Sequence, residues 1–167
     1  VEAIKSASWS DIQKMGKHLH SANSMAIARK RAFGSPNHEI EHYKKVLLHL
    51  VSQSSDREAV VKDLFESKEY KILGFGDSIL SELVAHAYPE HYIFKNSRSD
   101  FAESFLEIDD KKANAKGYQA FIKFSERMKL VVESYQSIVG KQTDMPITYE
   151  VDQFFSWLYQ TNKKNEP

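Results

Sequence analysis

A Gly-Phe-Gly motif, Gly74 to Gly76, is the most informative short pattern of the chain, and Ser78 follows it at the start of an apolar-periodic segment. Glycine tolerates positive φ and has no side chain, so successive amides can approach a bound anion. A helix that begins at Ser78 would add the amides and dipole of its first turn. The motif predicts a phosphate site in which Gly74, Gly76 and Ser78 present amides, while Phe75 plugs the hairpin into the core. The alternative is a purely structural turn.

Basic and polar side chains accompany this motif on both sides. Lys71 precedes it, and the segment from Lys95 to Arg98 follows Gly76 by about twenty positions. We expect Lys71, Lys95 and Arg98 to neutralise a nucleic-acid backbone, with Asn96 near the bound strand. Glu82, one turn beyond Ser78, opposes this interpretation.

Helix chemistry offers another role for the second segment. Asn96 or Ser97 can be the N-cap of a helix, and Arg98 can pair with Asp100 or Glu103. Both interpretations remain open at this level.

Two further groups of basic residues could contact phosphates. Arg29, Lys30 and Arg31 lie at the end of an expected helix, where they would also compensate the helix dipole. A second group lies on the longest expected helix and can equally be a solvated face; it consists of Lys111, Lys112, Lys116, Lys123, Arg127 and Lys129.

The segment from His38 to His42 satisfies the zinc-protease pattern His-Glu-x-x-His. That chemistry needs both histidines on a helix face that lines a cleft, together with a third ligand. At 100° per residue, the shared histidine face lies roughly opposite Ile40 and points to solvent. We therefore expect no metal site and no cofactor.

Apolar residues recur at helical spacing along the whole chain, and no segment alternates convincingly with period two. The sequence predicts an all-α fold of about six to seven helices in one globular bundle. The expected helices are Ser10 to Phe33, Asn37 to Val51, a short helix around Val60, Asp77 to Ala87, Ser97 to Leu106, about 115–139, and one from Tyr149 or Glu150. We expect a single domain over 1–161, with a hairpin unit at about 57–106 and a polar tail at 162–167.

Composition narrows the classes of function. The 167 residues contain 23 basic and 23 acidic side chains, so a nucleic-acid role must depend on local patches. The absence of cysteine excludes disulfides and thiolate chemistry. No apolar run could span a membrane, and a cytoplasmic protein is expected. Both ends look cut, which suggests a domain from a longer protein.

The segment from about Lys68 to Phe105 resembles the helix–hairpin–helix DNA-binding family, in particular the base-excision glycosylases. In that family the hairpin is Leu-Pro-Gly-apolar-Gly, and a catalytic aspartate follows about twenty positions later. Here Asn96 stands at that position, Ser78 replaces the lysine nucleophile, and Leu73 replaces the proline. The resemblance implies a retained binding scaffold without the chemistry.

Three motifs between Lys71 and Tyr159 look like helical regions attached to McrB-type AAA motor proteins of restriction and phage-defence systems. They are Gly-Phe-Gly-x-Ser-x-x-Ser-Glu-Leu, Tyr-Pro-Glu-His-Tyr followed by Asn-Ser-Arg, and the ending from Tyr149 to Tyr159. This resemblance implies a DNA-recognition or adaptor module beside an AAA motor or nuclease subunit. The chain itself has no phosphate-binding loop motif for nucleotide hydrolysis.

Together these observations predict a non-catalytic DNA-binding module that holds the phosphate backbone at the Gly-Phe-Gly hairpin. The alternative is a helical protein–protein interaction domain with a structural hairpin, whose Phe-rich last helix docks onto a partner.

Overall fold

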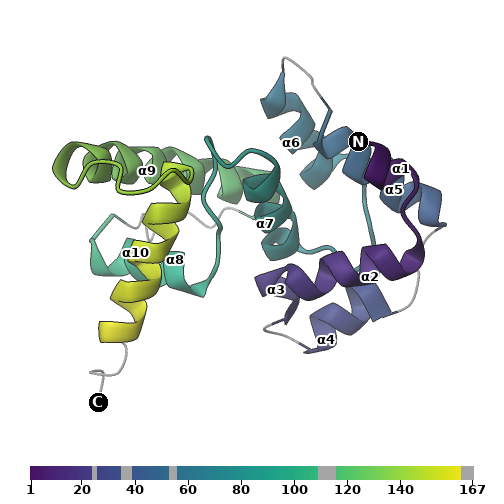
Figure 1. The fold of residues 1–167 in the computed structure, drawn as a ribbon, viewed down its shortest axis with the longest axis horizontal. Helices are drawn as coiled ribbons and strands as arrows, with labels where there is room; N and C mark the ends of the chain where they lie inside the picture. The colour runs from purple at the N-terminus through teal and green to yellow at the C-terminus, as the bar shows by residue number, and fades with distance from the viewer. Residues whose placement is uncertain (24–25, 35–38, 53–55, 109–115, 163–167) are drawn as a thin grey trace. The chain divides into compact units, whose positions relative to one another are not determined.

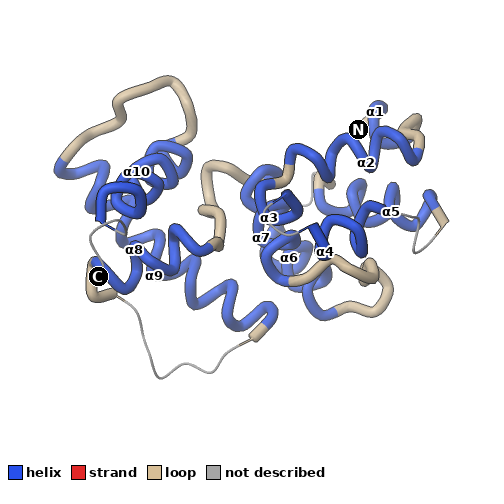
Figure 2. The backbone as a smooth tube through the Cα atoms, turned by 90° about the horizontal axis from the view of Figure 1, so that it is seen from below, coloured by secondary structure: helices blue, strands red, loops and turns tan. Residues whose placement is uncertain are grey.

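The computed structural model describes residues 1–167 except 24–25, 35–38, 53–55, 109–115 and 163–167. The described residues form helices, turns and loops without a strand, which confirms the all-α class (Figures 1 and 2). The elements are α1 (Glu2–Lys5), α2 (Trp9–His18), α3 (His20–Asn23), α4 (Ala26–Arg29), the π-helical turn η1 (Lys30–Gly34), α5 (Ile40–Leu50), α6 (Arg57–Glu66), α7 (Asp77–Ala87), α8 (Ser97–Phe105), α9 (Gly117–Ile138) and α10 (Ile147–Asn162).

The described part therefore contains more helical segments than the six or seven expected, because three of them are single turns of four residues. The helix expected from Ser10 to Phe33 is divided into α2, α3, α4 and η1. It also starts earlier: the Ser8 hydroxyl accepts from the Asp11 amide in a capping box, so α2 begins at Trp9.

Backbone contacts divide the chain into two compact units, Val1–Ala87 (unit 1) and Tyr88–Pro167 (unit 2). The boundary falls inside the expected hairpin unit at about 57–106, and neither that unit nor the single domain over 1–161 is established. Of the expected tail, residues 163–167 lie outside the described part, and Asn162 is the last residue of α10.

In unit 1, the short N-terminal helices pack onto a layer made by α5, α6 and α7. The side chain of Gln13 fastens α2 to η1, since its Nε2 donates to the Phe33 carbonyl at 3.0 Å. Gly16 permits the close approach of the two elements, because a Cβ there would lie 2.5 to 2.9 Å from the Phe33 ring. The resulting core includes Tyr43, which is fully buried and meets the Trp9 ring edge-on at 5.1 Å.

In unit 2, α10 packs against both α8 and α9 (Figure 2). The core of this unit is built from Ile93, Ala102, Phe124, Met128, Val151, Phe155 and Leu158. A partly buried ion pair connects two of its helices, because Arg127 Nε donates to Glu103 Oε1 at 2.5 Å. Among the described helices, none joins the length and the apolar character that crossing a membrane demands.

Candidate nucleic-acid interface

The Gly-Phe-Gly motif forms a tight turn that ends where α7 begins. The Phe75 amide donates to the Ile72 carbonyl at 3.1 Å, and the Gly76 carbonyl accepts from Leu80 as the first bond into α7. The Phe75 ring lies 5.1 Å from the Phe33 ring and 6.1 Å from the Tyr43 ring. Phe75 therefore anchors the hairpin in unit 1, and its amide is used inside the turn.

Gly74 fits the hairpin closely against η1. Its φ is +93°, in the left-handed region, and a Cβ on it would lie 2.8 to 2.9 Å from backbone atoms of Arg31 and Ala32. Glycine is thus required here twice, once for the dihedral angle and once for the close approach. The consequence is that the hairpin supports the backbone of a basic segment rather than standing alone.

Several other positions of the hairpin face solvent. Lys71, Gly76 and Ser78 are exposed, and a Cβ at Gly76 would meet nothing within 4 Å. The His42 ring donates to the Lys71 carbonyl at 3.0 Å, so α5 fixes the start of the hairpin. The first turn of α7 begins at Asp77, and amides of a first turn have no partner within their own helix.

The three other predicted site residues belong to unit 2, where each has a role within that unit. Asn96 is the N-cap of α8: its Oδ1 accepts from the amides of Arg98 (2.8 Å) and Ser99 (3.1 Å). Lys95 Nζ lies 2.7 Å from the Asp100 carboxylate.

Arg98 contacts α10 instead of the expected Asp100 or Glu103. Its Nη1 donates to the Ser156 hydroxyl at 2.9 Å, and its Nη2 lies 3.8 Å from Asp152. The predicted residues therefore form two groups, Lys71 to Ser78 in unit 1 and Lys95 to Arg98 in unit 2.

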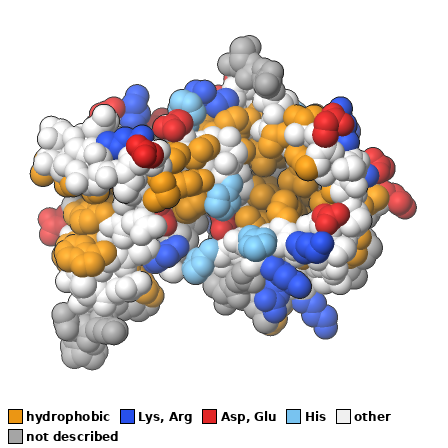
Figure 3. Space-filling view, in the orientation of Figure 1, with side chains coloured by type: hydrophobic (Ala, Val, Ile, Leu, Met, Phe, Trp, Pro, Cys, Tyr) orange, Lys and Arg blue, Asp and Glu red, His pale blue; other side chains and the backbone are white. Residues whose placement is uncertain are grey.

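A basic cluster adjoins the hairpin. It consists of Lys17, Arg29, Lys30 and Arg31, all exposed, and His18 and His20 are exposed beside it in sequence. Lys17 is one helical turn beyond Gln13, whose side chain bonds to η1. Figure 3 shows Lys, Arg and His side chains gathered where Figure 1 draws α2, α3 and α4.

The sequence carries a signal for this cluster that a short-motif search misses. No acidic residue occurs between Asp11 and Glu39, although the chain has equal numbers of acidic and basic side chains. Arg29, Lys30 and Arg31 are visible as a run, but Lys17 joins them only when α2 is packed on η1.

The sequence analysis took Glu82 as an argument against an anion site at the hairpin. In the structure its side chain points into unit 1. It is 7 % exposed, and its carboxylate accepts from the amides of His20 (2.6 Å) and Ser21 (2.8 Å) and from the Ser21 hydroxyl. Burial would raise the pKa of Glu82, but hydrogen bonds from His86, Ser21 and His20 outweigh it and lower the pKa to about 2. This carboxylate is an internal cap for α3 and does not face the hairpin surface.

The remaining candidates are distributed as follows. Arg127 of the long-helix group is held by Glu103, and Lys111 and Lys112 lie outside the described residues. His38 of the His-Glu-x-x-His pattern also lies outside them. Within the described part, no three histidine, aspartate or glutamate side chains are placed to hold a metal ion.

Comparison of the chain with protein-family models, with curated proteins and with solved structures finds no match. The two resemblances noted in the sequence therefore remain predictions.

Proposed function

We propose that the protein binds nucleic acid without catalysing a reaction on it, and that the phosphate backbone lies along the basic cluster and the adjoining hairpin of unit 1. The observation that carries this proposal is the contact of Gly74 with the backbone of Arg31 and Ala32, which holds an exposed hairpin and an exposed basic run together. Four cations of the cluster and Lys71 supply about five phosphate contacts.

The sequence composition around the basic cluster also supports this surface. Lys95 and Arg98 are already near carboxylates of unit 2. The basic cluster lies in a segment of 27 residues, 12–38, that contains no acidic residue. The charged side chains of that segment are therefore all basic. A role beside an AAA motor or nuclease subunit in a defence system is a further expectation of the resemblance.

Fluorescence anisotropy with labelled single- and double-stranded DNA tests the proposal. Five phosphate contacts predict an affinity loss of about 500-fold between about 50 and 200 mM salt. The triple variant Arg29→Ala/Lys30→Ala/Arg31→Ala should bind more weakly and should lower the slope of log affinity against log salt by about three. Gly76→Glu, which meets open space, should also weaken binding by placing a carboxylate at the hairpin.

The matched control is Arg57→Ala/Lys62→Ala/Lys68→Ala, which removes three exposed cations of unit 1 outside the cluster. It should bind with nearly the parental salt slope. A parent chain that fails to bind at low salt, or a cluster variant that binds like the parent, would refute the proposal.

A second candidate function, a protein–protein interaction domain, is favoured by one specific observation in unit 2. In the second half of α9, Leu130 and Ile138 are exposed, and Val131, Val132 and Tyr135 are only partly buried against the core. Apolar surface gathered in this way marks interaction sites more often than it marks an ordinary monomer surface.

A further inference from the structure

An apolar patch covers the C-terminal end of α9 and the adjoining side of α10. Tyr135, Ile138 and Val139 lie on one side of α9, because residues three and four positions apart share a helix face. Ile138 is 83 % exposed and Trp157 of α10 is 58 % exposed. We define the apolar patch as Tyr135, Ile138, Val139, Met145, Phe154 and Trp157.

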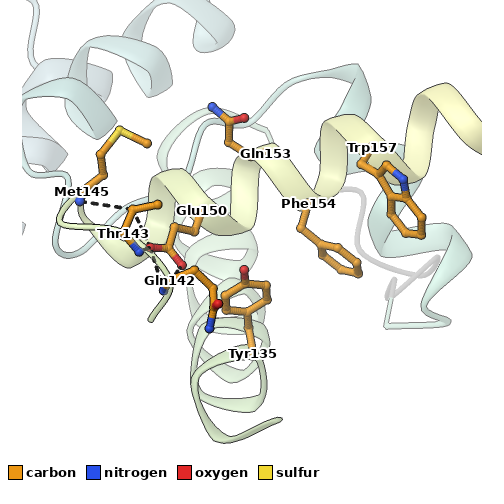
Figure 4. Close-up of a pocket in the computed structure, with 8 residues that line it drawn as sticks. All are labelled: Tyr135, Gln142, Thr143, Met145, Glu150, Gln153, Phe154 and Trp157. Carbon is orange, nitrogen blue, oxygen red and sulfur yellow. Dashed lines mark hydrogen bonds between the residues drawn. The ribbon is translucent and has the colours of Figure 1, made fainter. Parts of the chain in front are cut away.

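The centre of the patch is an open groove of about 410 Å³. Its aromatic wall is continuous: the Tyr135 and Phe154 rings lie 6.1 Å apart, and the Phe154 and Trp157 rings lie 6.0 Å apart and nearly parallel. Figure 4 shows Phe154 and Trp157 projecting from the same side of α10, with Tyr135 beside Phe154. Aromatic side chains offer a large contact area and have few rotatable bonds. Such side chains are typical of the energetic centre of interfaces.

The loop that closes one end of the groove is held in place by a buried carboxylate. Glu150 accepts from the amides of Gln142 (3.0 Å) and Thr143 (2.7 Å) and from the Thr143 hydroxyl. The Thr143 hydroxyl oxygen in turn accepts from the Met145 amide at 3.2 Å (Figure 4). These bonds lower the pKa of Glu150, with the Thr143 hydroxyl as the largest cause. A loop ordered in advance reduces the entropy lost on binding.

The charge of the groove restricts its occupant. None of its eight described lining residues is Lys or Arg, and its carboxylate, Glu150, is used by the loop amides. The polar lining residues around the aromatic wall, Gln142, Thr143 and Gln153, are uncharged. The loop beside this lining carries one exposed cation, Lys141, and one exposed anion, Asp144. A partner of one strong charge therefore gains little here, whereas a copy of the same surface brings charges of both signs.

We propose that the apolar patch binds a second copy of the chain, in a symmetric dimer in which the two patches face each other. An isologous pair is the commonest arrangement among homo-oligomers, and an apolar centre with a polar rim is the usual composition of such interfaces. The exposed apolar area of the patch is on the order of several hundred Å², which is toward the upper end for apolar patches on monomeric proteins. Its polar rim would bring each side toward the roughly 800 Å² of a stable interface.

Sedimentation equilibrium of the whole chain tests the dimer. The parent should reach twice its 19.3 kDa as concentration rises. Trp157→Glu and Ile138→Glu should each raise the dimer dissociation constant by at least about thirtyfold, as expected for a central interface residue. Both positions are exposed in the single chain, so urea unfolding of the diluted variants should match the parent.

Leu130→Glu is the matched control. Leu130 is on the same helix and is 64 % exposed. It lies about 140° around α9 from Tyr135 and about 80° from Ile138, and it is about 12 Å along the axis from Ile138. This variant should dimerise like the parent. A parent that stays monomeric at all concentrations, or a Trp157→Glu variant that dimerises like the parent, would overturn the proposal and leave the groove to a different partner protein.

Discussion

Single side chains show which contacts can be predicted from the sequence and which cannot. The cap formed by Asn96 was one of two roles that the sequence left open, because capping is decided within four residues. The partner of Arg98 is Asp152, 54 positions later, and no local pattern could indicate it. Glu82 was interpreted as opposing a phosphate at the hairpin for the same reason, since its acceptor role depends on α3 packing against α7.

The first prediction concerns Glu82 and pH. Its folded-state pKa of about 2 lies below the ordinary 4.5, so its carboxylate stabilises the fold above about pH 4.5, and this stabilisation is lost as pH falls toward 2. Glu82→Gln should lower the free energy of unfolding at neutral pH by about 2 kcal/mol, because buried amides lose a charged acceptor. Urea unfolding measures both chains, and their difference should shrink between pH 4.5 and 2. A difference that does not change with pH would contradict this assignment.

At the level of elements, periodicity located the long helix well and the N-terminal helix poorly. The expected helix at about 115–139 is α9, Gly117–Ile138, because its buried residues recur at helical spacing: Tyr118, Phe121, Phe124 and Met128. The expected helix from Ser10 to Phe33 breaks at Leu19, which is buried and extended with ψ of 120°. The amides of His20 and Ser21 bond to Glu82 there, so a tertiary acceptor overrides the local helical pattern.

The two hairpin glycines give a matched pair of variants at this scale. Gly74→Ala should destabilise unit 1 by about 2 kcal/mol or more, since the new Cβ meets backbone of η1 and the φ is positive. Gly76→Ala should change the free energy of unfolding by less than about 0.5 kcal/mol, because its Cβ enters open space. Thermal or urea unfolding compares them. Equal effects at both glycines would mean that the hairpin does not depend on its contact with Arg31 and Ala32.

At the scale of the whole molecule, the balanced charge of the chain conceals an uneven distribution. The basic cluster lies in unit 1, whereas the neutral apolar patch lies in unit 2. The sequence suggested both a nucleic-acid surface and a docking helix as alternatives. The two surfaces belong to different units, so the two proposals do not compete for the same residues.

If both proposals hold, a dimer carries two basic clusters and should bind long DNA with avidity. Trp157→Glu should then reduce affinity for a duplex long enough to reach both clusters, while leaving a duplex that fits one cluster unaffected. Linked sites commonly gain a factor on the order of 100 or more. Anisotropy over a series of duplex lengths measures this gain, with Leu130→Glu as control. Equal losses on short and long duplexes would show that Trp157 acts on DNA binding itself.

The bond between Glu82 and α3 also has a consequence for synthesis of the chain. The acceptor for the amides of His20 and Ser21 lies 62 and 61 residues further along. A growing polypeptide that has emerged from the ribosome only as far as α6 carries the basic residues of α2, α4 and η1 but not the carboxylate that orders the α2–α3 junction. The N-terminal helices can therefore reach their final arrangement only after α7 has been translated and has closed that long loop.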